Sequence, residues 1–225
     1  PFGWLQTFFL KNRVVHFVGD PIDTILKNNN ISYFKSILKI LFFLPEYFMF
    51  ILACYGNVKV FSNGHHISKK LKKVGILAKP LISTTLIPSD FYHKEILQNS
   101  KKFKLLYVGY LRKAKGVDVV INAFKILNDE FSNTFSLSVV GKGEDEFYLH
   151  NLADSLGVEV SFLGHIDDRK ALNNIMRESD IFCFASLSEG SPRVILEAIA
   201  NGLSIVTTPV GSLPYIFKDK QDLLF

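Results

Sequence analysis

The chain has 225 residues, 48% of them hydrophobic and 21 of them phenylalanine, so it can bury a sizeable core in one large domain or two small ones. Its two cysteines, Cys54 and Cys183, both lie in apolar runs. This placement is typical of reduced thiols in a cytosolic protein and excludes a disulfide framework. We see no secretory signal and therefore expect a cytoplasmic protein.

The net charge of +5 is concentrated in the first part of the chain. Residues 1–100 carry a net charge of +7, and residues 101–225 carry −2. A basic half can attract nucleic acid, an anionic membrane surface or an anionic substrate, although a protein that is simply rich in lysine shows the same bias. Because neither aromatic–basic interleaving nor a helix-turn-helix spacing occurs, we expect no nucleic-acid partner.

A strand is predicted within residues 13–21, where RVVHFVGDP runs into a Gly-Asp-Pro turn. In an open α/β sheet, ligands bind at the carboxyl ends of strands, so Gly19 and Asp20 are candidate site residues. A plain turn is an equally good interpretation. His16, inside the strand, is expected to pack in the core rather than to act as a base.

The segment of residues 32–56 is strongly apolar, and between Ile40 and Tyr55 its only charge is Glu46. A membrane-spanning helix needs about 20 apolar residues. We interpret this run as shorter and as broken by Pro45-Glu46, so a spanning helix is not expected. The favoured interpretation is a pair of core helices. The alternative is an amphipathic surface that dips into a bilayer, with Lys35 and Lys39 at the headgroups.

The next segments complete a first domain and lead into a second. Residues 57–76 predict a strand, a turn and a short basic helix whose lysines at 69–73 form a solvated face. Residues 79–102 are predicted to connect the domains. From residue 103 onward strands and helices alternate, which predicts a doubly wound parallel sheet.

Basic groups follow the first strand of the second domain, at Arg112, Lys113 and Lys115. Cations at the end of a parallel strand can neutralise a diphosphate leaving group. Lys113 is better interpreted as solvated. The following helix is expected to pack through an apolar face of Val119, Val120, Ala123 and Phe124.

Two further strands end in candidate ligand loops. The strand that begins at Phe135 runs into a turn with Gly141 and Gly143, which allow close backbone approach to a ligand. The strand of residues 160–166 ends at His165-Ile166. The next two residues, Asp167-Asp168, are better interpreted as caps of a helix than as a metal pair.

The most informative stretch is residues 181–211. Two apolar runs, 181–185 and 203–208, flank a helix, so the strands should be parallel and joined by a right-handed crossover. Ser191-Pro192 is expected to start the helix and Gly202 to end it. Its core face is expected at four apolar positions, Val194, Leu196, Ile199 and Ala200.

Two glutamates, Glu189 and Glu197, lie in this stretch. The helix N-terminus beside Glu189 can hold an anion such as a phosphate, because its N–H groups are unpaired and carry partial positive charge. A carboxylate near such a site is suited to accept hydrogen bonds from the hydroxyls of a sugar or a ribose. Taken singly, each glutamate is equally compatible with an ordinary solvated position.

The Glu-x7-Glu spacing and its context, SLSEGSPRVILEAIANGLSIVTTPVGS, resemble the signature of family 4 glycosyltransferases, which are retaining GT-B enzymes. The resemblance runs from about Tyr107 to Phe225. It implies that Glu197 holds the nucleotide ribose and that Glu189 contacts the donor sugar. Lys115 matches a lysine that binds the donor diphosphate. Tyr110 stands where the family has an arginine, and Arg112 is the candidate substitute. Further donor contacts are implied for Gly190, Ser191, Gly141, Gly143, His165, Ile166 and Gly211.

These observations predict an α/β protein of the GT-B class, with two Rossmann-like domains whose parallel sheets face each other across a cleft. Residues 1–95 are expected to be an incomplete acceptor-side domain and residues 96–225 the donor-binding domain. The acceptor is expected near Gly19-Asp20. The resemblance implies transfer, with retention, of a sugar from a nucleotide-diphosphate donor to a glycan or lipid-linked acceptor in cell-surface polysaccharide synthesis. Neither a metal nor another cofactor is expected, and the protein is expected to be cytoplasmic, with peripheral contact to an anionic membrane at the inner face of the plasma membrane.

The chain looks truncated at both ends relative to this family, which leaves alternatives open. One is a nucleotide-sugar-binding fragment or pseudoenzyme without transfer activity. Another is a nucleotide-sugar epimerase of the same fold, which would turn over the donor without an acceptor. Fold alone does not name the nucleotide, the sugar or the linkage.

Overall fold

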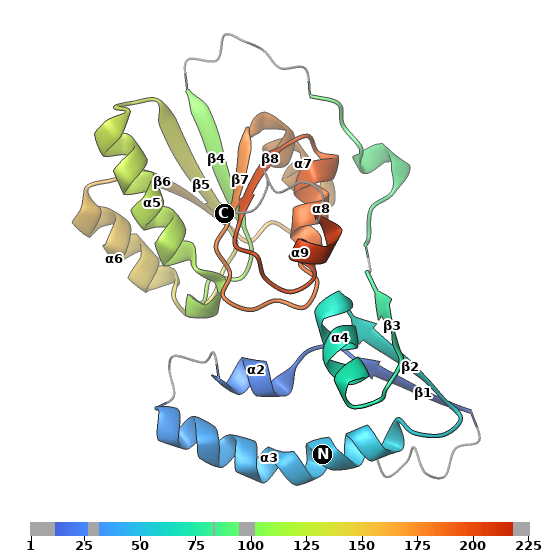
Figure 1. The fold of residues 1–225 in the computed structure, drawn as a ribbon. Coiled ribbons are helices and arrows are strands. Elements are labelled where there is room, and N and C mark those ends of the chain that lie inside the picture. Colours follow the sequence, from blue (N-terminus) through green and yellow to red (C-terminus); the bar gives the residue numbers. More distant parts are fainter. Residues whose placement is uncertain (1–11, 27–31, 83, 95–101, 218–225) are drawn as a thin grey trace. The chain divides into compact units, whose positions relative to one another are not determined.

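The computed structural model describes residues 12–26, 32–82, 84–94 and 102–217 (Figure 1). Its contacts divide the chain into two units. The first contains the residues up to Ser83 together with two loop segments, Ser188–Ser191 and Gly211–Tyr215. The second contains Thr84–Leu187, Pro192–Val210 and the residues from Ile216 onward. Each unit is described separately below.

The first unit has a sheet of three parallel strands in the order β1-β2-β3, with β1 at Arg13–Phe17, β2 at Val58–Asn63 and β3 at Ala78–Leu81. Its helices are α2 (Pro21–Leu26), α3 (Tyr33–Ala53) and α4 (His65–Lys73). Its core is a cluster of buried apolar side chains, namely Val15, Cys54, Val60, Ile67, Leu71 and Ile76. His16 is exposed on β1, so its expected core position is wrong.

Helix α3 is one continuous helix of 21 residues that contains Pro45, so neither the expected break nor the expected helix pair exists. The expected core position is also wrong, because among its described residues only Ser36 and Ala53 are buried. Five exposed apolar side chains recur at helical spacing and share one face. This apolar stripe consists of Phe34, Leu38, Leu41, Phe48 and Leu52. By length and composition alone α3 could cross a membrane, a property that many core helices of soluble proteins share.

The second unit has a five-stranded, entirely parallel sheet in the order β6-β5-β4-β7-β8. The strands are β4 (Phe103–Val108), β5 (Phe135–Val140), β6 (Val160–Gly164), β7 (Ile181–Phe184) and β8 (Ser204–Thr207). The helices between them are α5 (Val117–Glu130), α6 (Glu146–Leu156), α7 (Arg169–Glu178) and α8 (Arg193–Ala200). The short α9 (Leu213–Ile216) follows β8 in the sequence, and all but its last residue belong to the first unit. Helices α5 and α6 lie to one side of the sheet, and α7 and α8 to the other (Figure 1). The predicted doubly wound parallel sheet is therefore confirmed.

Helices α5 and α8 bury partly different faces from those expected. In α8 the buried residues are Ile195, Ala198 and Ala200, while Ile199 is 39% exposed. In α5 they are Val117, Val120, Ile121 and Phe124. The side chain of Val119 is 52% exposed. Gly202 has the left-handed backbone conformation (φ +83°) expected of the residue that ends α8.

The segment of residues 84–94 belongs to the second unit although it precedes the first strand of that unit. Its centre is Asp90, whose side chain is only 3% exposed. The Asp90 carboxylate accepts hydrogen bonds from the Arg169 guanidinium, from the Ile87 N–H (2.8 Å) and from the Asn173 amide (2.9 Å). Farther along, Lys94 forms an ion pair with Asp180 at 2.7 Å. We call the Asp90 carboxylate with its three donors, Ile87, Arg169 and Asn173, the Asp90 anchor.

The Asp90 anchor predicts a specific pH dependence of stability. The hydrogen bond from Arg169 is the largest cause that lowers the pKa of Asp90 to about 2, and the Ile87 N–H adds to it. Because the folded pKa is below the ordinary value of 3.8, this stabilisation is complete above about pH 4 and is lost as the pH falls toward about 2. Asp90→Asn should therefore lower Tm at pH 7 by roughly 5 °C and reduce the loss of Tm between pH 4 and pH 2.

Thermal unfolding followed by circular dichroism between pH 2 and pH 7 measures this effect. Asp154→Asn removes an exposed carboxylate from α6 and is the matched control. An Asp90→Asn protein with the Tm and the pH profile of the unsubstituted protein would show that the anchor contributes nothing.

Candidate functional site

The loops that follow β4, β5 and β6 are joined to each other by backbone hydrogen bonds. Because the three strands are parallel neighbours, their carboxyl ends lie at one edge of the sheet. The Gly109 N–H donates to the Val140 carbonyl (3.0 Å), and the Leu111 N–H donates to the Lys142 carbonyl (3.0 Å). The Gly141 N–H donates to the Gly164 carbonyl (2.8 Å). This edge is therefore a connected backbone surface, at the position where open parallel sheets bind ligands.

The predicted glycines of the Gly-x-Gly turn are required by this packing. A Cβ at Gly141, where φ is +141°, would lie 1.8 Å from the Gly109 carbonyl oxygen. A Cβ at Gly143 would lie 2.1 Å from the Leu111 carbonyl oxygen. Both distances are impossible for non-bonded atoms, so a side chain at either position would push the β4 and β5 loops apart. The packing accounts for both glycines whether or not a ligand approaches them.

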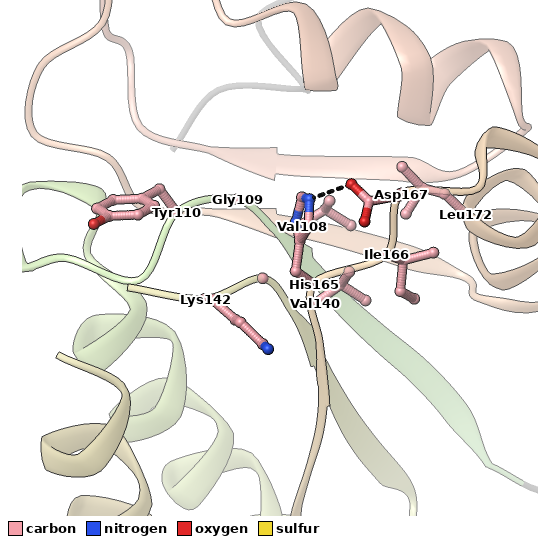
Figure 2. Close-up of a pocket in the computed structure, with 10 residues that line it drawn as sticks. Val108, Gly109, Tyr110, Val140, Lys142, His165, Ile166, Asp167 and Leu172 are labelled. Carbon is pink, nitrogen blue, oxygen red and sulfur yellow. Dashed lines mark hydrogen bonds and ion pairs between the residues drawn. The ribbon is translucent and has the colours of Figure 1, made fainter. Parts of the chain in front are cut away.

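A pocket of about 590 Å³ opens at this edge of the sheet. It is lined by Val108, Gly109, Tyr110, Val140, Gly141, Lys142, His165, Ile166, Asp167 and Leu172. Three predicted donor-binding residues, Gly141, His165 and Ile166, thus share one pocket. Its polar side chains are few, and Figure 2 shows the imidazole of His165 paired with Asp167, at 2.8 Å between Nε2 and Oδ1. The volume and the mostly apolar lining are typical of a small-molecule site.

The two aspartates that follow β6 have different roles. Asp168 caps α7, because its side chain accepts a hydrogen bond from the Lys170 N–H (2.9 Å). Asp167 instead contacts His165. Within the described ranges, no group of three His, Cys, Asp or Glu side chains is placed to share a metal ion.

The hydroxyl of Tyr110 forms a hydrogen bond with the carboxylate of Glu144. This bond is the largest cause of the raised pKa of Tyr110. The pKa of Glu144 is lowered, mainly by its own backbone N–H and then by Tyr110, with a contribution from the charge of Arg112. Arg112 therefore lies close enough to Glu144 for the glutamate's negative charge to offset part of the positive charge of Arg112.

The loop that carries Lys115 is tied to the carboxyl end of β7. The Ala114 carbonyl accepts hydrogen bonds from the Leu187 N–H (2.9 Å) and from the Ser186 hydroxyl (3.1 Å). Gly116 has φ +66°, and a Cβ there would lie 2.0 Å from the Ala185 carbonyl oxygen. Strands β4 and β7 are neighbours in the sheet, and the strand order reverses between them. Such a switch point is where doubly wound sheets form their ligand crevice.

Glu197 lies on α8 and is half-buried. Its Oε1 accepts a hydrogen bond from the Thr85 hydroxyl (3.2 Å), and its charge contributes to the raised pKa of Arg169. Glu197 is thus a carboxylate that already accepts an alcohol hydroxyl, as the proposed ribose contact requires. Sequence reasoning missed Thr85 and Arg169, because 112 residues separate Thr85 from Glu197 and no local pattern connects them.

The loop with Glu189, Gly190 and Ser191 packs on the loop that follows β8. The Ser212 N–H donates to the Gly190 carbonyl (3.0 Å). A Cβ at Gly211, where φ is +58°, would lie 2.5 Å from the Gly190 carbonyl oxygen. The predicted tight turn at Gly211 is therefore present. The expected helix start is wrong by one residue, because Pro192 is the N-cap of α8 and no side chain caps the helix.

Gly19 and Asp20 follow β1, as predicted. Asp20 accepts a hydrogen bond from the Ile22 N–H (3.0 Å) and forms an ion pair with Lys70 on α4 (2.6 Å). Part of the lysine cluster on α4 is thus engaged rather than simply solvated. The role of Gly19 and Asp20 toward an acceptor stays a prediction.

Residues 88–225 match the family described as glycosyl transferases group 1. An uncharacterised glycosyltransferase of Methanocaldococcus jannaschii is 31% identical over 208 residues, which are 89% of this chain and 52% of that protein. An uncharacterised glycosyltransferase of Haemophilus influenzae is 34% identical over 121 residues, which are 53% of this chain and 33% of that protein. An α-1,4-N-acetyl-D-galactosaminyltransferase of Campylobacter jejuni, whose name gives a saccharide on PP-undecaprenol as its acceptor, is 27% identical over 130 residues, 57% of this chain and 33% of that protein.

Among solved structures, WaaG, a glycosyltransferase involved in lipopolysaccharide biosynthesis, has a TM-score of 0.63 at 20% identity, covering 96% of this chain and 64% of WaaG. This likeness concerns the fold, which confirms the predicted GT-B class. The chain spans about a third to a half of the length of the relatives named above. It belongs to the group 1 glycosyltransferase family, with the parallel sheets of the GT-B fold.

Proposed function

We propose that the protein transfers a sugar from a nucleotide-diphosphate sugar to a glycan or lipid-linked acceptor, with retention of anomeric configuration and without a metal ion. The observation that carries the proposal is the pocket at the carboxyl ends of β4, β5 and β6, in a chain of the group 1 family. The undecaprenol-linked acceptor of the Campylobacter jejuni relative supports a lipid-linked acceptor and a role in cell-surface polysaccharide synthesis. Residues 1–95 would be the acceptor side and residues 96–225 the donor side.

The proposed reaction breaks the bond between the anomeric carbon and the diphosphate oxygen. The acceptor hydroxyl oxygen bonds to that carbon on the same face, and its proton passes to the leaving diphosphate. Glu189 positions the donor sugar, and Glu197 accepts hydrogen bonds from the ribose hydroxyls. Lys115, with Arg112, stabilises the negative charge that develops on the diphosphate. The acceptor lies near Gly19 and Asp20.

Nucleotide binding tests the donor site directly. Calorimetric titration with UDP, GDP and ADP should show saturable binding of one of them. Glu197→Ala should weaken that binding roughly tenfold or more, because a charge-assisted hydrogen bond to ribose is lost. Glu159→Ala, which removes an exposed carboxylate next to β6, is the matched control. If a folded protein binds none of the three nucleotides, the active-transferase proposal fails and an inert fragment is favoured.

Lys115 should act on the diphosphate and not on the nucleoside. Lys115→Gln should therefore weaken binding of the preferred nucleoside diphosphate roughly tenfold and leave binding of the corresponding nucleoside unchanged. Lys113→Gln, two residues earlier in the same turn, is the matched control. An equal loss for nucleoside and nucleoside diphosphate would instead indicate that the substitution disturbs the loop.

We further propose that α3 contacts an anionic membrane from the cytoplasmic side. Its apolar stripe is exposed along a helix about 31 Å long, and the residues up to 100 carry an excess of positive charge. Lys35 and Lys39 lie to one side of the stripe by helical spacing, where they can meet anionic headgroups. Such a contact would bring the protein to a lipid-linked acceptor.

Vesicle flotation measures this contact. The protein should float with phosphatidylglycerol vesicles more than with phosphatidylcholine vesicles, and salt should release it. Changing three exposed stripe residues to serine, as Phe34→Ser, Leu41→Ser and Phe48→Ser together, should abolish flotation, while Lys35→Gln with Lys39→Gln should remove the preference for anionic lipid. If the protein stays in the membrane fraction of cells after alkaline extraction, α3 spans the membrane and the proposed peripheral contact is wrong.

A further inference from the structure

Four side chains of the second unit form a hydrogen-bonded chain that ends on Glu197. Buried Asp90 holds the guanidinium of Arg169, with an additional bond from Arg169 Nε to Asp90 Oδ1 (3.3 Å). Arg169 Nη1 donates to the Thr85 hydroxyl oxygen (3.4 Å). That hydroxyl donates its proton to Glu197 Oε1 (3.2 Å). The order is therefore Asp90, Arg169, Thr85 and Glu197.

The hydrogen bonds from Arg169 to Thr85 and from Thr85 to Glu197 run in one direction, from donor to acceptor. A threonine hydroxyl has one proton, and in this arrangement the proton is committed to Glu197. Donation from Arg169 to the same oxygen polarises the hydroxyl and makes it a better donor. The hydroxyl thereby presents to the carboxylate the group that a ribose presents, a secondary alcohol that donates one hydrogen bond.

We propose that Thr85 is an internal competitor for the ribose position of Glu197. Its hydroxyl occupies Oε1 of the Glu197 carboxylate. A ribose hydroxyl of a nucleoside diphosphate that bonds to the same oxygen displaces it. Arg169, fixed by Asp90, is the positioning residue that holds Thr85 in place. This inference rests on the proposed function, because it takes Glu197 as the ribose contact.

The consequence concerns the segment of residues 84–94. Its part from Ile87 onward is fixed by the Asp90 anchor, through the Ile87 N–H and the Arg169 guanidinium. Thr85 precedes the anchor, and its side-chain bonds are those to Glu197 and Arg169. When nucleotide takes the place of Thr85, residues 84–86 lose a bond to α8 while the anchored part keeps its bonds. Occupancy of the donor site is thereby transmitted to the start of this segment.

The first experiment compares nucleotide affinities by calorimetry, with whichever of UDP, GDP and ADP binds. Thr85→Val preserves the shape of the side chain and removes the competing hydroxyl, so affinity should rise roughly threefold to tenfold, the range expected for one exchanged hydrogen bond. Thr84→Val is the matched control, because the Thr84 hydroxyl accepts from the Leu86 N–H (3.1 Å) and does not contact Glu197. For the 2′-deoxy or 3′-deoxy nucleotide that lacks the hydroxyl bound by Glu197, the advantage of Thr85→Val should disappear.

Hydrogen exchange supplies a readout that a purely structural role of Thr85 would not give. Saturating nucleotide should raise amide exchange at Leu86, whose N–H donates to the Thr84 hydroxyl, in the unsubstituted protein. The hydrogen-bonded amides of Asp90 and Tyr92 should stay protected. In Thr85→Val the Leu86 amide should exchange quickly without nucleotide and respond little to it.

The outcomes separate this proposal from the donor site itself. If nucleotide binding requires Glu197 but Thr85→Val leaves the affinity unchanged or lowers it, the proposed competition by Thr85 is wrong. The proposed donor site is not contradicted by that result. Binding that is insensitive to Glu197→Ala, or no binding by a folded protein, overturns both.

Discussion

The hydrogen bonds between the loops after β4, β5 and β6 are the constraint on which the candidate site depends. They join the Gly109, Leu111 and Gly141 N–H groups to carbonyls at or just after the ends of the neighbouring strands. Because these bonds are made by backbone groups, the floor of the pocket is built before any ligand arrives. A preformed surface of this kind lowers the conformational cost of binding, since few groups must be ordered when the ligand enters.

Much of the second unit could be predicted, because each of its strands is a short apolar run bounded by polar or glycine-containing turns. The parallel pairing of β7 and β8 and the left-handed Gly202 follow from that pattern. The buried face of α8 could not be predicted from composition, since apolar residues surround most of that helix. Contact with the sheet selects Ile195 and Ala198 over Val194 and Ile199.

The first unit was harder to predict for two physical reasons. Strand β3 has the sequence AKPL, which contains a lysine and a proline, and such residues indicate a connection rather than a strand. An edge position accommodates them, because an edge strand leaves one row of N–H groups without a ladder partner, and β3 is at the edge of its sheet. In α3, apolar residues occur on nearly every face, so the sequence contained no period from which a buried side could be chosen, and Pro45 did not end the helix.

The Asp90 anchor, rather than the first strand β4, determines where the second unit begins in the sequence. The match to the group 1 family begins at residue 88, fifteen residues before the first residue of β4, and Asp90 lies in this interval. A buried carboxylate with three donors from Ile87, Arg169 and Asn173 is costly to separate from its partners. The segment is therefore retained with the sheet as part of the fold. The same anchor orients Arg169, and through it Thr85, toward Glu197, so the element that completes the fold also places a hydroxyl at the carboxylate of the proposed donor site.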